Sequence, residues 1–135
     1  VRSLSTMGHV IGAHTMTHRR LSSQNKGIVS HEVVGSKRRL EKELGRDVLW
    51  FAYPFGDIDS ISADAMKIIS DQFRFCRSAI RGVNDAETNP IAVRADHIDL
   101  SGPCSYRTLV LEGGLDGFYL KARGRLDRLC PPLGG

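Results

Sequence analysis

The fold of this chain is decided by one stretch near its start, Gly8-His9-Val10-Ile11-Gly12-Ala13-His14-Thr15-Met16-Thr17-His18. His14 and His18 lie four residues apart, directly after a short apolar run, so a turn or short helix would direct both imidazoles to one side. Neutral imidazole is the commonest protein ligand for zinc-like metals. The pair predicts half of a metal site, which needs a third protein ligand and an open position for water to be catalytic.

Composition limits the chain to a single domain at most, since it has 135 residues with 41% hydrophobic and 25% charged. The net charge of +4 is mildly basic, but the basic residues are spread out with few aromatics between them, so no nucleic-acid partner is expected. No apolar run approaches a membrane span, and membrane contact is not expected. Cys76, Cys104 and Cys130 lack metal-ligand spacing and are odd in number, which indicates buried or free thiols.

Apolar runs and helical periodicity alternate along the chain. A first helix is predicted with Ser22 or Ser23 as its cap and Gly45 as its stop, and a second helix with Asp59 or Ser60 as its cap. Strands alternating with helices predict an α/β fold with mostly parallel strands, either an open sheet or part of a larger barrel. The predicted strands are residues 10–13, 48–53, 73–78 and 91–98, and the predicted helices are residues 22–44, 60–73, 105–111 and 115–129. The last helix is predicted to be amphipathic and basic, and its apolar side consists of Leu115, Phe118, Ala122, Leu126 and Leu129.

A second candidate motif is Phe51-Ala52-Tyr53-Pro54-Phe55-Gly56-Asp57. A strand that ends in Pro and then Gly turns sharply and exposes backbone N–H groups at its carboxyl end, where they can form an oxyanion hole. The aromatic side chains can also wall a sugar-sized pocket. The alternative is an aromatic core strand followed by a simple turn.

Both motifs resemble those of a known family. The pattern Gly8-His9-x-Ile11-Gly12-x-His14-Thr15-x-x-His18-x-x-Leu21-Ser22 is similar to the second motif of the NodB-type polysaccharide deacetylases, carbohydrate esterase family 4. The run from Phe51 to Gly56 resembles their third motif, and Arg81 to Asn84 and Arg94 follow in the order of that branch. The resemblance covers residues 1–129.

The resemblance implies an α/β fold, a partial distorted (β/α) barrel whose amino-terminal strands are missing. It divides the chain into a partial deacetylase domain at 1–114, an amphipathic basic helix of the same domain at 115–129, and a loose tail at 130–135. It implies a hydrolase that removes acetyl groups from an N- or O-acetylated polysaccharide, cutting amide bonds other than peptide bonds. It also implies a divalent metal, usually zinc, although two imidazoles suit cobalt or nickel equally.

The resemblance also assigns roles to individual residues. His14 and His18 correspond to metal ligands, and the backbone N–H of Phe55 to the oxyanion donor. His97 is the one downstream histidine that could serve as the general acid, whereas His9 and His31 are expected to be structural or exposed. The substrate-binding residues that it implies are Tyr53, Pro54, Phe55 and Arg94.

Three departures from the family pattern bear on activity. No residue matches the first motif, an Asp-Asp segment upstream of the histidines that gives the base and the third metal ligand. Ala52 replaces the usual arginine of the third motif, and the late Leu-x-His element has no clear match. We therefore expect a truncated, poorly active chain that binds metal weakly and self-associates through an exposed sheet edge. The alternative is a non-catalytic saccharide-binding or interaction module. Family members often act at the cell envelope, but the sequence leaves localisation open.

Overall fold

Three short parallel strands form the centre of the molecule, in the order β1 (Gly12–Ala13), β2 (Trp50–Ala52) and β3 (Phe75–Arg77). The computed structural model describes residues 1–132. Gly12 pairs with Trp50, and Trp50 pairs with Phe75. Helices connect the successive strands, as parallel pairing requires. The predicted α/β class with a parallel sheet is confirmed.

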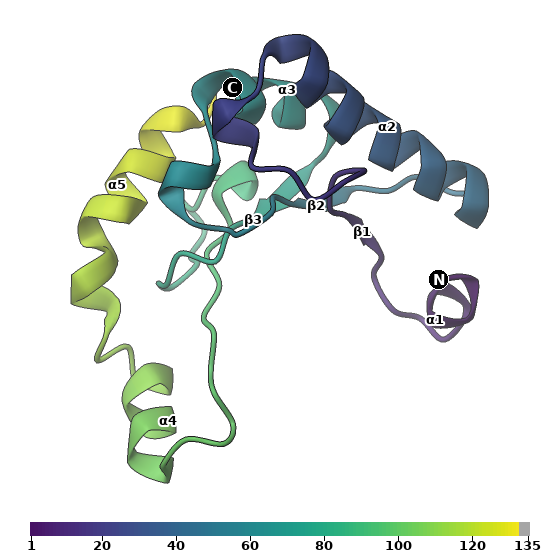
Figure 1. The fold of residues 1–135 in the computed structure, drawn as a ribbon. Helices are drawn as coiled ribbons and strands as arrows, with labels where there is room; N and C mark the ends of the chain where they lie inside the picture. Colours follow the sequence, from purple (N-terminus) through teal and green to yellow (C-terminus); the bar gives the residue numbers. More distant parts are fainter. Residues whose placement is uncertain (133–135) are drawn as a thin grey trace.

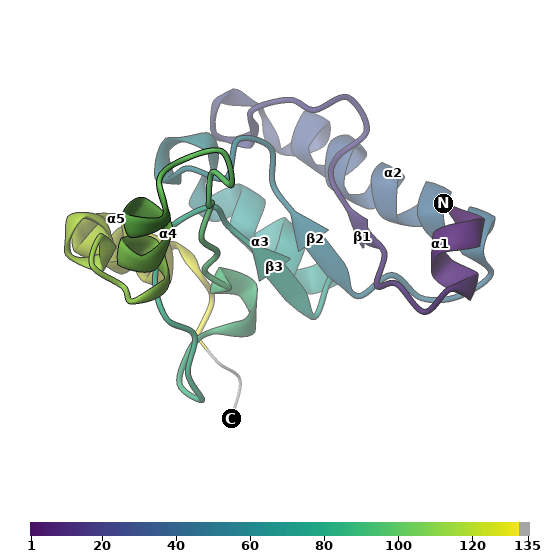
Figure 2. The same cartoon turned by 90° about the horizontal axis from the view of Figure 1, so that it is seen from below.

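Among residues 1–132, five α-helices lie over one face of the sheet and at its two sides (Figure 1). Two of them, α2 and α3, lie on one face of the sheet, and Figure 2 shows that no helix of residues 1–132 covers the strands on the opposite face. The carboxyl-terminal helices α4 and α5 run down one side of the molecule, and α1 lies at the other end (Figure 1). Their bounds are α1 (Arg2–Thr6), α2 (Lys26–Leu44), α3 (Ala63–Gln72), α4 (Cys104–Leu111) and α5 (Leu120–Leu129), with 3-10 turns at Leu21–Ser23, Ile58–Ser60, Pro90–Ala92 and Asp116–Tyr119.

The hydrophobic core lies between the sheet and the pair of helices α2 and α3. Each strand contributes one fully buried side chain, whereas Trp50, Ala52 and Phe75 are half-buried and Arg77 is exposed. On the half-buried side, Trp50 and Phe75 stack with their ring centroids 4.4 Å apart. The core residues from these elements are Ala13, Phe51, Cys76, Val29, Val33, Ala65, Met66 and Ile69.

The predicted helix starts were wrong by a few residues. Asn25 caps α2 by accepting a hydrogen bond from the Ile28 amide at 2.9 Å, and Ser62 caps α3 by accepting one from the Ala65 amide. The expected caps at 22, 23, 59 and 60 lie in separate 3-10 turns, because an extended residue follows each turn and interrupts the helix. Similarly, α4 starts at Cys104 after Pro103, one residue before the predicted cap. Gly45 ends α2 in the left-handed conformation, as predicted.

The predicted fourth strand at 91–98 was also wrong. Pro90 begins a 3-10 turn that Asn89 caps, and proline lacks the N–H that a ladder needs. Only Val93 pairs with the sheet, through an isolated parallel bridge to Arg77. The segment thus touches the edge of β3 without extending the sheet.

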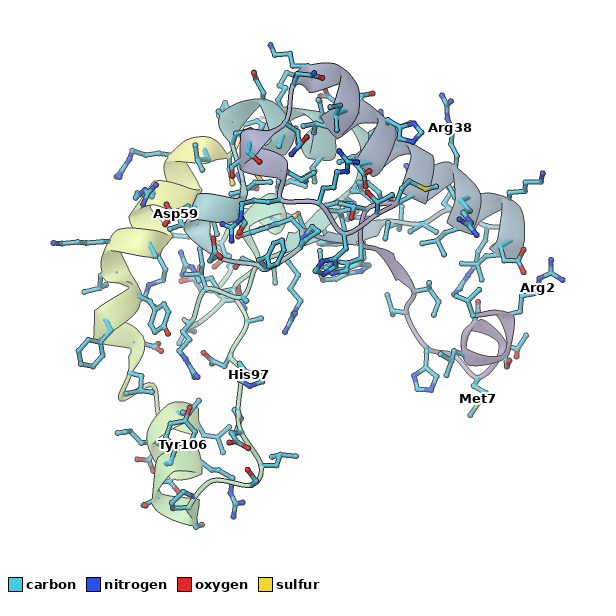
Figure 3. The ribbon with its side chains drawn as sticks, viewed as in Figure 1. Arg2, Met7, Arg38, Asp59, His97 and Tyr106 are labelled. Atoms are coloured by element: carbon cyan, nitrogen blue, oxygen red, sulfur yellow. The ribbon has the colours of Figure 1, made fainter. Side chains whose placement is uncertain are left out.

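The basic carboxyl-terminal helix packs on the core through Leu126, which is fully buried. Phe118 is exposed, contrary to the predicted apolar side, because residues 116–119 form a 3-10 turn that directs Tyr119 toward the core instead. Arg125 forms an ion pair with Asp59 at 3.0 Å. Asp59 lies in the 3-10 turn before α3 (Figure 3). Of the predicted loose tail, Pro131 accepts a hydrogen bond from Asn89, and residues 133–135 lie outside the described part of the chain.

The cysteines fit the expectation of buried or free thiols. All three cysteines are free, and burial raises the pKa of the Cys76 thiol, which makes it a poor nucleophile. Within residues 1–132, none of the helices combines the length and the apolar character that crossing a membrane requires.

Candidate functional site

His14 follows directly after β1, at the carboxyl end of the parallel sheet, where ligand sites form in α/β folds. Its Nδ1 lies 2.7 Å from the carbonyl oxygen of Ala52, the last residue of β2. Because a carbonyl oxygen can only accept, Nδ1 carries the proton and donates. In the neutral imidazole, Nε2 is then the nitrogen with the lone pair, which is the arrangement that orients metal-binding histidines.

His18 and Phe55 complete a three-ring cluster with His14. The ring centroids of His14 and His18 are 4.9 Å apart, and those of His18 and Phe55 are 5.1 Å apart, both in edge-on orientation. Both histidines are exposed to solvent. The structure thus joins the two sequence motifs at one place, although they are separated by the whole of α2.

The backbone at this cluster is strained. Within residues 1–132, the non-glycine residues with positive φ are Thr15 at 62°, His18 at 60° and Phe55 at 67°. Each of these costs free energy for a residue with a side chain, and such residues concentrate at functional sites. All three residues belong to the two candidate motifs, so the strained backbone coincides with the site that the sequence motifs predict.

The turn after β2 is held tightly around Gly56. The Tyr53 hydroxyl and the Ala79 amide both donate to the Gly56 carbonyl at 2.9 Å. Gly56 has a φ of 69°, and a Cβ there would lie 2.5 Å from the Cβ of Ala79. The Phe55 N–H donates to no acceptor in the part of the chain that the structure describes. The turn therefore presents one free amide next to the histidine pair.

The residues of this turn that are expected to bind substrate differ in their exposure to solvent. Phe55 is 54% exposed, and the guanidinium of Arg20 lies 4.9 Å from its ring centroid. Tyr53 and Pro54 are buried beneath it, and burial raises the pKa of the Tyr53 hydroxyl. Only Phe55 offers a ring to a ligand, while Tyr53 and Pro54 support the turn from below.

Arg94 and His97 lie on a separate part of the molecule. The Arg94 guanidinium donates to the Val83 carbonyl at 2.8 Å and contacts Asp127 of α5 at 3.4 Å. His97 is exposed on the segment that leads to α4, near Tyr106 (Figure 3), and its carbonyl accepts from Arg81. Within residues 1–132, no hydrogen bond or ring contact joins either residue to the histidine pair.

The imidazole nitrogens of His14 and His18 suit a borderline-soft divalent metal, but they are only two ligands. Two exposed imidazoles are present, one of them with its free nitrogen fixed by a hydrogen bond. No group of three or more His, Cys, Asp or Glu residues that could hold a metal occurs among residues 1–132. A cavity of about 610 Å³ opens beside His14, between the edge of β1 and α2. The chain therefore offers two ligands in an open setting.

Sequence reasoning missed Glu32, a residue that contacts the histidine segment. It lies on α2, is 2% exposed, and accepts hydrogen bonds from Met16 and Thr17. The signal was present in the sequence, because Glu32 falls between Val29 and Val33 on the apolar face of a predicted helix. A carboxylate in such a position is rarely buried without donors.

Comparison with known proteins identifies the family. Residues 1–70 match the family model described as polysaccharide deacetylase. The chain belongs to the polysaccharide deacetylase family. The resemblance inferred from the two motifs is thereby confirmed. No match was found among curated proteins.

Solved deacetylases share the fold of this polysaccharide deacetylase chain. The deacetylase PplD of Streptococcus pyogenes, solved in complex with acetate, aligns with a TM-score of 0.70 and 17% identity over 81% of this chain and 47% of its own. A polysaccharide deacetylase from Bacillus cereus aligns with a TM-score of 0.67 and 20% identity, over 82% of this chain and 34% of its own. The chain thus spans less than half the length of either protein and corresponds to part of their fold.

Proposed function

We propose that this chain contributes to metal-dependent removal of acetyl groups from an N- or O-acetylated polysaccharide, with zinc as the favoured metal. The observation that carries the proposal is the hydrogen bond from His14 Nδ1 to the Ala52 carbonyl, which leaves Nε2 free beside His18. His14 and His18 would hold the metal. When bound, a divalent metal supplies Lewis-acid polarisation of the acetyl carbonyl and lowers the pKa of the attacking water.

Phe55 contributes in two ways to the proposed reaction. Its backbone N–H has no acceptor within residues 1–132 and lies on a strained turn beside the pair, which supports a role as donor to the developing oxyanion. Its exposed ring supports a role in stacking against a sugar face. His97 and Arg94 remain proposals for the general acid and for a substrate contact, and they depend on the resemblance alone.

We expect low activity from this chain on its own. Two neutral imidazoles leave the charge of a dication uncompensated, so the affinity for metal should be low. A catalytic zinc site has three protein ligands and one open position. The residues described here supply two of these.

Acetate release tests the proposal directly. The chain is incubated with zinc and acetylated chito-oligosaccharide, or with an O-acetylated xylan, and free acetate is measured. His14→Ala should abolish acetate release, while His31→Ala, an exposed histidine on α2, should leave it unchanged. Equal release by wild type and His14→Ala would refute the proposal.

A second candidate is saccharide binding without turnover. The exposed Phe55 ring with Arg20 over it favours this function, because such a platform needs no metal. Binding of the same oligosaccharide is then lost in Phe55→Ala and retained in His14→Ala. Loss of binding in His14→Ala would exclude the metal-independent module.

A further inference from the structure

The segment between the two histidines rests on one buried carboxylate. Glu32 Oε2 accepts hydrogen bonds from the Met16 amide at 2.9 Å and the Thr17 amide at 2.8 Å. Its Oε1 accepts from the Thr17 hydroxyl at 2.6 Å. A carboxylate that leaves water needs such donors, and backbone amides bonded to a charged acceptor are held firmly. Glu32 and the segment therefore fix each other.

These hydrogen bonds act on a segment whose backbone is strained at both ends. Thr15 and His18 both have positive φ, and the His18 amide donates to the Thr15 hydroxyl at 3.0 Å. Strained conformations of this kind persist only where the surroundings over-determine them. Met16 and Thr17 are the two residues between the strained positions, and both are bonded to Glu32.

Glu32 is not itself one of the metal ligands. Both of its oxygens are engaged with Met16 and Thr17, and no cluster of three potential ligands occurs within residues 1–132. Its influence on His14 and His18 must pass through the backbone that joins them.

We propose that Glu32 is a positioning residue that presents His14 and His18 to a divalent metal by fixing the strained backbone between them. The proposal rests on the metal-binding function proposed above. Glutamine is a weaker partner, because its neutral carbonyl oxygen must accept from both backbone amides without the charge that strengthens these bonds, and its NH₂ group reverses the bond to the Thr17 hydroxyl.

Glu41 provides a matched control on the same helix. Its carboxylate also accepts a backbone hydrogen bond, from Val48 at 3.1 Å, and it pairs with Lys37 at 3.7 Å. Glu41→Gln therefore removes a comparable charge and contact without touching the histidine segment.

The first experiment measures the binding of Co²⁺ by its visible absorption. Glu32→Gln should weaken the affinity about 10- to 100-fold relative to wild type, the usual loss when a group that orients a ligand is removed. Glu41→Gln should bind as wild type does. Equal affinities for wild type and Glu32→Gln, or equal losses in both variants, would overturn the proposal.

The second experiment needs no metal and separates the two proposals. Hydrogen exchange by NMR should show faster exchange of the Met16 and Thr17 amides in Glu32→Gln than in Glu41→Gln. If wild type binds no Co²⁺ through His14, the metal function fails and the exchange rates alone decide the role of Glu32. Unchanged exchange in Glu32→Gln would overturn that role.

A milder variant covers the case in which Glu32→Gln does not fold. Thr17 is exposed, and Thr17→Val removes only the hydroxyl that donates to Glu32 Oε1. We expect a smaller loss of Co²⁺ affinity and faster exchange of the Thr17 amide with the fold intact. A Thr17→Val protein identical to wild type in both measurements would contradict the proposal.

Discussion

Single residues carry the geometry of the site, and Gly56 shows how closely it is packed. A Cβ at Gly56 would lie 2.5 Å from the Ala79 Cβ and 2.7 Å from its amide nitrogen, in a backbone with positive φ. Gly45 has nearly the same φ, with nothing within 4 Å. The two glycines therefore separate the cost of backbone strain from the cost of a clash.

We predict that Gly45→Ala lowers the free energy of unfolding by about 1 kcal/mol, the cost of the left-handed conformation alone. Gly56→Ala should lower it by at least about 2 kcal/mol more, since overpacking adds to the strain. Urea denaturation of both variants measures the difference. Equal losses would show that the turn at Phe55 yields to accommodate the methyl group.

The pH dependence of stability tests the charge state of Glu32. Burial would raise the pKa of Glu32, but the hydrogen bonds from Thr17 and Met16 and the charge of Arg19 outweigh burial and lower it. A carboxyl whose pKa is lower in the folded protein than in the unfolded chain stabilises the fold at pH values above its pKa in the unfolded chain. This stabilisation is lost as the pH falls through the pKa of the carboxyl in the folded protein.

We therefore expect Glu32→Gln to lower the free energy of unfolding by about 1–3 kcal/mol at neutral pH. The gap between wild type and variant should shrink as the pH falls through the lowered pKa of Glu32 in the folded protein, because the protonated side chain loses its charge-assisted hydrogen bonds. Urea titrations at several pH values measure this gap. A gap that stays constant with pH would mean that folding does not shift the pKa of Glu32.

At the scale of elements, the sequence predicted the strands and helices better than their limits. The apolar runs before His14 and before Pro54 form strands only over Gly12–Ala13 and Trp50–Ala52, and Val10 and Leu49, which precede these strands in the two runs, are exposed. The starts of α2 and α3 could not be predicted, since several serine, asparagine and aspartate residues precede these two helices and all of them can cap. The structure places extended residues between these candidates, and only the last one caps.

Helix α5 gives a direct test of element packing. Leu126 is fully buried against the core, whereas Leu120 on the same helix is exposed. Leu126→Ala should lower the free energy of unfolding by about 2–5 kcal/mol, and Leu120→Ala should change it by less than about 0.5 kcal/mol. Equal effects in chemical denaturation would indicate that α5 does not dock as a fixed part of the fold.

At the scale of the whole molecule, the sheet has one free edge in the described part of the chain. β1 pairs only with β2, and the exposed Val10 lies just before it. Free strand edges promote association. We expect the apparent mass in sedimentation velocity to rise with protein concentration.

Val10→Lys should suppress this association, because a lysine at a strand edge opposes pairing. The control is Val83→Lys, an equally exposed valine on the loop after β3. Association that persists in Val10→Lys, or that disappears in both variants, would place the contact elsewhere.

The candidate site was predictable only in part, for a physical reason at this scale. Local spacing identified His14, His18 and the turn at Phe55, because each motif is continuous in sequence. The contacts that join them, from Ala52 to His14 and from Glu32 to Met16, cross 38 and 16 residues and depend on packing. Sequence spacing alone gives no access to such contacts.

The measurement that tests the central claim most directly is calorimetric titration of the chain with zinc. We predict weak binding, well short of nanomolar affinity, that is lost in His14→Ala and in His18→Ala and retained in His31→Ala. Zinc binding that survives unchanged in His14→Ala would contradict the account, because the metal would then be held somewhere other than the histidine pair.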